Sequence, residues 1–186
     1  RWWVVHLWVE GFFEVFATVV LAFILSRIGA VSEKFAHTTV YLAVTLYLGS
    51  GVIGTFHHLY WSGTPGPIMA LGGVFSALEV VPLTLLGFEA AMNLRTIEKA
   101  GPAYEYRWPL YFFISVAFWN LVGAGVFGFL INPPIILYYI QGINTTPIHA
   151  HTALFGVYGL LAIALALFSV RHIFRKDAWS DSLLKW

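Results

Sequence analysis

Five apolar stretches, each long enough to cross a lipid bilayer, constrain this sequence most strongly. A helix needs about 20 mostly apolar residues to cross the hydrocarbon core. The expected spans are residues 3–26, 35–60, 68–94, 108–131 and 147–170. Polar or Gly/Pro-rich segments such as SRIGAVSEK and YWSGTPGP separate them. The sequence therefore predicts an all-α fold, a polytopic transmembrane helix bundle.

Composition excludes several other classes of protein. The chain is 59% hydrophobic and 10% charged, far less charged than soluble domains. It lacks the sustained polar alternation of a membrane β-barrel. A net charge of +1 with no basic run argues against a nucleic-acid partner, and the absence of cysteine excludes thiolate metal sites. Because the chain begins RWWVVHLWVE, we expect one part of a larger membrane domain that packs against the remaining helices of the same subunit.

The basic residues predict the orientation in the membrane. Of the ten Lys and Arg residues, all but Arg1 fall in the first loop, the third loop or the segment after the fifth span. Cytoplasmic loops are enriched in Lys and Arg, so this side should face the cytoplasm. The residues concerned are Arg27, Lys34, Arg95, Lys99, Arg107, Arg171, Arg175, Lys176 and Lys185.

Most of the seven histidines are predicted to lie at one depth in the membrane. Alternating helix directions bring the start of the first span, the end of the second and the start of the fifth to the outer side. A single buried imidazole is most simply a satisfied core residue, but a set at one depth indicates metal binding. His37 and His172, near cytoplasmic ends, are interpreted as interfacial side chains. The outer set is His6, His57, His58, His149 and His151.

The first outer group has spacing suited to one metal ion. His6 and Glu10 are four residues apart and share a helix face, and Glu14 continues that face one turn deeper. His57 and His58 are adjacent, so both can reach a centre beside their helix. Three imidazoles and one carboxylate suit iron, copper or zinc and do not choose among them.

His149 and His151 are predicted to serve two different centres. At about 100° per residue they lie about 200° apart, on opposite faces of one helix. Haem is the flat cofactor that an imidazole in a membrane bundle would bind. Thr146 is the expected N-cap and Pro147 the first helical residue. The alternative is an interfacial helix start without a cofactor.

Four carboxyls lie inside the predicted spans, where ionisable groups are functional candidates. Glu10 and Glu14 belong to the first group. Glu79 lies three residues before Pro82, which should kink its helix and turn the carboxyl toward the metal chamber. The alternative for Glu79 is a neutral carboxyl in a helix–helix hydrogen bond. For Glu89, near the cytoplasmic end, a functional role and a purely structural role are equally favoured.

Four motifs, HLWVE, GTFHHLYW, FSALEVVPL and PIHAHTALFGVYG, resemble the haem-copper oxidase superfamily. Within it they are most similar to catalytic subunits of nitric oxide reductases, in the same order and over essentially the whole chain. Many oxygen-reducing members have His-x-x-x-Tyr on the helix of the first metal-binding histidine. Here the fifth position is Glu10, as in nitric oxide reductases.

The resemblance implies reduction of two nitric oxide molecules to nitrous oxide and water. It implies a non-haem iron, a high-spin haem b bound by His149, and a low-spin haem b with His151 as one axial ligand. The second axial ligand would come from an earlier helix. Glu14 and Glu79 match glutamates that support the active site and proton delivery. The implied iron ligands are His6, Glu10, His57 and His58.

Local similarity favours quinol over cytochrome c as the electron donor. The implied location is a bacterial-type inner membrane, with the active site toward the outer face. Relatives that act as nitric oxide dismutases or oxygen reductases remain as alternatives, and Glu10 argues against both. From other classes, a proton-coupled transporter without haem or an electron-transferring dihaem anchor would also place glutamates or histidines in the membrane.

Overall fold

The computed structural model describes residues 1–99, 104–174 and 180–184, and every regular element within them is helical. Five helices are long and apolar enough to cross a membrane, which confirms the predicted all-α bundle with five spans. Several ends differ by a few residues from those expected, most of all at the end of the third span. The spans are Trp3–Arg27, Glu33–His58, Gly66–Lys99, Arg107–Ile131 and Thr145–Ile173.

Each span consists of several helical segments, and four of these segments are π-helical. The first two spans comprise α1 (Trp2–Val5), η1 (His6–Phe12), α2 (Phe13–Arg27), α3 (Glu33–Leu46), η2 (Tyr47–Gly51), α4 (Val52–Gly54) and η3 (Thr55–His58), followed by η4 (Tyr60–Ser62). The third and fourth comprise α5 (Gly66–Leu78), α6 (Val81–Lys99), α7 (Arg107–Trp119), η5 (Asn120–Val126) and α8 (Phe127–Ile131). The rest are α9 (Pro134–Ile140), α10 (Thr145–Ala153), η6 (Leu154–Gly159), α11 (Leu160–Ile173) and α12 (Asp181–Leu184).

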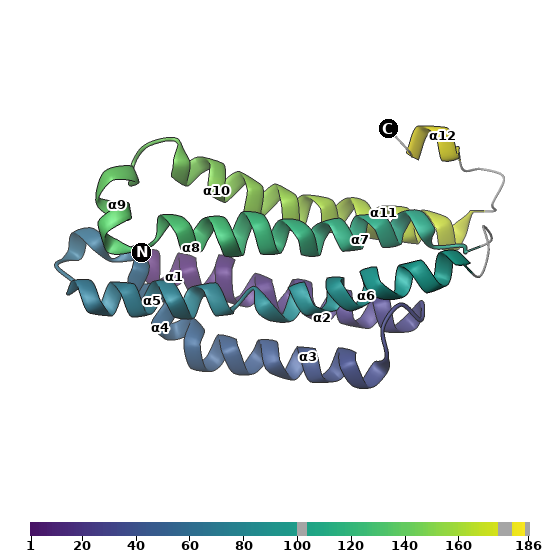
Figure 1. Ribbon diagram of the computed structural model, residues 1–186, viewed down its shortest axis with the longest axis horizontal. Coiled ribbons are helices and arrows are strands. Elements are labelled where there is room, and N and C mark those ends of the chain that lie inside the picture. The colour runs from purple at the N-terminus through teal and green to yellow at the C-terminus, as the bar shows by residue number, and fades with distance from the viewer. Residues whose placement is uncertain (100–103, 175–179, 185–186) are drawn as a thin grey trace.

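The spans lie side by side along the long axis of the molecule (Figure 1). The N-terminus, α9 and the start of α10 lie at one end, and the end of α6, the start of α7 and the end of α11 lie at the other. Helix α2 packs against α3 and α6, α6 against α7, and α7 against α11. The fully buried apolar core between these helices includes Leu21, Leu25, Leu83, Leu86, Leu110 and Phe113.

Large apolar side chains also cover the outside of the bundle, as expected for a surface in contact with lipid. Phe23 is 65% exposed and Phe88 63% exposed, although transfer of such side chains from water is favourable. The fifth span is the least covered, with 22% of its most apolar window buried. The exposed face of the fifth span is therefore the part of the bundle most suited to contact lipid or further helices.

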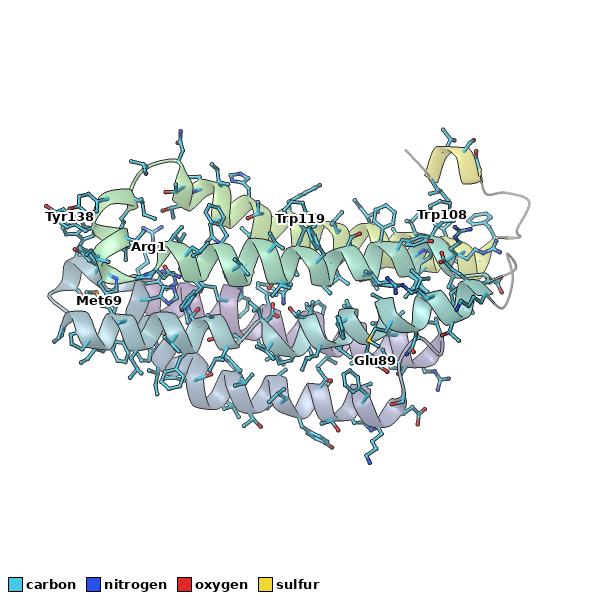
Figure 2. The ribbon with its side chains drawn as sticks, viewed as in Figure 1. Arg1, Met69, Glu89, Trp108, Trp119 and Tyr138 are labelled. Atoms are coloured by element: carbon cyan, nitrogen blue, oxygen red, sulfur yellow. The ribbon has the colours of Figure 1, made fainter. Side chains whose placement is uncertain are left out.

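The two ends of the bundle differ in charge. Arg27, Lys34, Lys99, Arg107 and Arg171 all belong to span ends on the side of the α6–α7 connection. Figure 2 shows Trp108 and Glu89 toward this end, and Met69 and Tyr138 at the opposite one. Arg95, also predicted for the charged side, lies within α6. Three further basic residues predicted for that side, Arg175, Lys176 and Lys185, lie outside the described residues.

The structure locates one predicted helix feature and corrects another. The bend expected near Pro82 appears as an interruption at Glu79 and Val80, between α5 and α6. The predicted start of the fifth span is corrected: α10 begins at Thr145, after Asn144, rather than at Pro147. A helix can start before this proline because the first turn has unpaired N–H groups in any case, so the missing donor costs nothing there.

Close packing of α6 against α7 predicts a strong effect at Gly87. A methyl group there would overlap the Cβ of Ala117 on α7. Overpacking of this kind costs about 1–3 kcal/mol, so Gly87→Ala should lower the thermal unfolding midpoint of the full-length protein in detergent. Gly49→Ala is the matched control, because no described atom lies within 4 Å of a Cβ at Gly49. Equal midpoints for the two variants would contradict this packing.

Candidate metal centre and haem ligands

Two distorted helical segments bring four predicted metal ligands together. His6 and Glu10 lie on the π-helical segment η1, and His57 and His58 lie on the 3₁₀ segment η3. One potential ligand atom from each lies within 4.8 Å of all the others. Local departures from α-helical geometry often occur at functional sites, because they redirect side chains that a regular helix would place elsewhere.

The carboxylate of Glu10 is at the middle of this cluster. Its Oε2 lies 2.8 Å from His6 Nδ1 and 3.7 Å from His57 Nε2. Its Oε1 lies 2.7 Å from His58 Nε2. His6 is fully buried and His57 is nearly so, whereas the Glu10 side chain is 33% exposed. Water therefore cannot readily solvate the two rings, and their polar atoms depend on Glu10 or on a bound cation for a partner.

A backbone contact fixes the orientation of the His6 ring. Nε2 lies 3.1 Å from the carbonyl oxygen of Gly51. A carbonyl only accepts hydrogen bonds, so Nε2 must carry the proton, and Nδ1 of the neutral ring presents a lone pair to Glu10. Nδ1 has no well-directed hydrogen-bond partner among the described residues. Two lone-pair groups 2.8 Å apart repel each other unless a proton or a metal ion lies between them.

The donor set therefore fits a metal ion. Three imidazole nitrogens and one carboxylate oxygen converge at a site where two residues are buried and two half-buried, and a backbone carbonyl orients one of the rings as in known metal sites. Iron, copper and zinc accept such nitrogen and oxygen ligands. A proton shared between His6 and Glu10 would satisfy that pair alone, but not the convergence of all four groups.

Two further carboxyls lie close to the cluster. Glu79, at the break between α5 and α6, is 5% exposed and its Oε1 lies 3.4 Å from His6 Nε2. Glu14 is also buried, and its Oε1 accepts a 3.0 Å hydrogen bond from Asn120 Nδ2. Sequence analysis missed Asn120, although a lone amide within an apolar span was a visible signal. Glu89, near the opposite end, is not part of this site.

A cavity connects the cluster with the fifth span. Its lining includes Glu10, Glu14, Glu79, Asn120 and His149. Apolar side chains from four of the spans complete its walls. The cavity thus places one imidazole of the fifth span opposite the carboxylate side of the metal cluster.

His149 is oriented as a ligand directed into this region. Its Nδ1 donates a 2.8 Å hydrogen bond to the Gly123 carbonyl, which leaves the lone pair on Nε2. The ring lies close against Gly128 of α8, where a methyl group would come within 2.9 Å of His149 Cε1. A larger residue at 128 would therefore displace the ring.

His151 lies on the outer surface of the same helix. It is exposed, and its Nδ1 donates a 2.7 Å hydrogen bond to the Pro147 carbonyl, again leaving Nε2 as the ligand atom. The structure therefore separates His149 from His151, one toward the cavity and the other away from the bundle. This arrangement fits two haem groups on either side of the fifth span.

The fold and the site together define an integral membrane protein with a buried histidine–carboxylate centre. The chain belongs to the family described as cytochrome c and quinol oxidase polypeptide I, which matches residues 1–186. Membership of this haem-copper oxidase family implies haem and metal cofactors. It also argues against the haem-free transporter considered from the sequence.

One similar protein is a nitric oxide reductase subunit of Stutzerimonas stutzeri. The two sequences are 32% identical over 174 residues. The alignment covers 92% of this chain and 36% of the relative. The chain therefore spans about a third of the length of the curated relative it matches.

The geometry predicts that Glu10 is needed for metal retention. Among the described residues, Glu10→Ala removes the only carboxylate within 4 Å of all three imidazoles. The purified full-length variant should lose most of its non-haem metal in elemental analysis, while its haem absorption bands persist. Glu33→Ala, at an exposed acid on α3, is the matched control. Full retention of the metal in the Glu10 variant would rule out this ligand set.

Proposed function

We propose that the protein containing this chain is a nitric oxide reductase. It would combine two nitric oxide molecules, two electrons and two protons to form nitrous oxide and water. The observation that carries the proposal is the Glu10 carboxylate, which lies among three imidazoles where oxygen-reducing relatives are expected to have tyrosine one turn from the first histidine. Family membership and the similarity to a protein named as a nitric oxide reductase subunit support it.

The proposed cofactors follow from the orientation of the ligands. His149 would bind a high-spin haem b on the cavity side of the fifth span, and His151 a low-spin haem b on the other side. When bound, the iron ions supply the sites at which the substrate is held and reduced. The non-haem iron would be held by His6, Glu10, His57 and His58.

The chain's own residues would orient the substrate and supply protons. The proposed metal-binding side chains lie on facing helices, so two nitric oxide molecules bound between them would be held close together. An oriented reaction would then replace a random encounter. The apolar walls, which include Val80, Ala124 and Val157, disfavour bulk water and admit a neutral substrate. Glu14 and Glu79 line the same cavity and would hold the protons that the reaction consumes.

The surroundings of the site suggest its place in a membrane. We propose a bacterial-type inner membrane, with the basic end of the bundle facing the cytoplasm and the metal centre toward the outer face. Quinol is the proposed electron donor. The exposed side of the fifth span, which carries His151, would pack against the remaining helices of the subunit and the low-spin haem.

Turnover under anaerobic conditions tests the proposed activity and donor. The full-length protein should convert nitric oxide to nitrous oxide with reduced quinol, at a higher rate than with reduced cytochrome c. Gas analysis with each donor gives both rates. Faster turnover with cytochrome c would contradict the proposed quinol donor but not the proposed reaction. Oxygen reduction without any nitrous oxide would contradict the proposed reaction.

The two haem ligands should be separable by optical spectroscopy. His151→Ala should remove the low-spin haem b band, because it deletes an axial ligand on the face of the fifth span that points away from the cavity. His149→Ala should instead alter the high-spin band and abolish turnover. His172→Ala, at an exposed histidine near the basic end, is the control and should change neither band. Loss of the same band in both variants would contradict the two-sided arrangement.

A further inference from the structure

Asn120 links three of the five spans at the level of the cavity. It lies at the start of η5 and is fully buried. Its Nδ2 donates 3.0 Å hydrogen bonds to Glu14 Oε1 on the first span and to the Val80 carbonyl on the third. Such an amide is costly in an apolar interior unless it is bonded. The two partners satisfy its nitrogen, whereas its buried Oδ1 has no hydrogen-bond partner among the described residues.

The two hydrogen bonds determine which way the amide points. The Val80 carbonyl can only accept, so the nitrogen of the Asn120 amide must face it. The second hydrogen of that nitrogen is donated in a hydrogen bond to Glu14 Oε1. Val80 also accepts from the backbone N–H of Thr84 at 3.2 Å, which anchors it at the break beside Glu79.

We propose that Asn120 is a positioning residue for the reaction, one that acts through Glu14. The amide holds Glu14 Oε1, so Oε2 is left as the oxygen that takes up and releases a proton in the cavity. The same amide fixes Glu14 relative to the segment that carries Glu79. This inference rests on the proposed function, because it gives Glu14 a role in proton supply.

A purely structural role for Asn120 predicts different behaviour. A leucine has the same number of side-chain heavy atoms with the same branching, although its methyl groups are bulkier than the amide, and it would occupy the same position in η5 between the neighbouring spans. It would lack both N–H groups, so Glu14 would lose its only described side-chain hydrogen bond. If packing were the sole function of residue 120, the leucine variant would keep its activity once folded.

The first experiment compares Asn120→Leu and Glu14→Gln, alone and combined, in the full-length protein. Asn120→Leu should lower nitric oxide turnover by about 10- to 100-fold, the range expected when a reacting group is misplaced by a small distance. Haem absorption and non-haem metal content should be unchanged. In the Glu14→Gln background, Asn120→Leu should cause no further loss, because both changes remove the same function.

An infrared measurement tests the contact without relying on turnover. The carbonyl stretch of protonated Glu14, identified by its loss in Glu14→Gln, should move to higher wavenumber in Asn120→Leu because a hydrogen bond to its oxygen is removed. Asn120→Asp, which keeps the shape but loses both N–H donors, should give a reduced rate as well. It serves as the second variant if the leucine protein does not assemble.

Asn93→Leu is the matched control. Asn93 also donates to a backbone carbonyl, that of Ala30, and to a glutamate, Glu89, but at the basic end of the bundle. Its turnover and the Glu14 band should match the unmodified protein. Full activity of Asn120→Leu, or an unshifted Glu14 band, would overturn the inference. A protein that forms no nitrous oxide at all contradicts the proposed function instead, and the infrared band then still decides whether Asn120 holds Glu14.

Discussion

The contact of the Glu10 carboxylate with three imidazoles is the interaction on which the rest of the site depends. It concentrates acceptor groups beside two buried rings, His6 and His57, while Glu10 and His58 are half-buried. Charges and lone pairs buried in this way are stable only when they are paired or bound to a cation. The π-helical turn at His6 and the 3₁₀ turn at His57 both serve this convergence. A metal ion would balance the cluster and explain why the bundle tolerates it.

Backbone carbonyls orient the histidines in a consistent manner. His6 donates to Gly51, His149 to Gly123 and His151 to Pro147. Each contact assigns the proton to one ring nitrogen and leaves the other as a ligand atom. Two of the acceptors lie in or next to π-helical segments, where the regular hydrogen-bond ladder is disturbed and carbonyls can accept from side chains. The distortions therefore shape both the ligand cluster and the surface that His149 faces.

The fifth span separates two environments. One side carries His149 toward the cavity, and the other carries the exposed His151 together with most of the uncovered apolar surface. A span with so little buried surface is well suited to lie between the described bundle and further helices. This agrees with a chain that covers about a third of its relative. Electrons that pass between the two proposed haems would cross this span, where the two histidines are only two residues apart.

The sequence by itself determined the five spans, and it predicted that histidines of the first, second and fifth spans lie at one end of the bundle. Hydrophobic length and helical periodicity are local properties, so they also placed His149 and His151 on different faces and His6 beside Glu10. Only the tertiary structure decided which nitrogen of each ring faces its partner, where the third span is interrupted, and that Asn120 bonds to Glu14. Those two residues are 106 positions apart. A contact of that kind depends on how whole helices pack, which no local periodicity records.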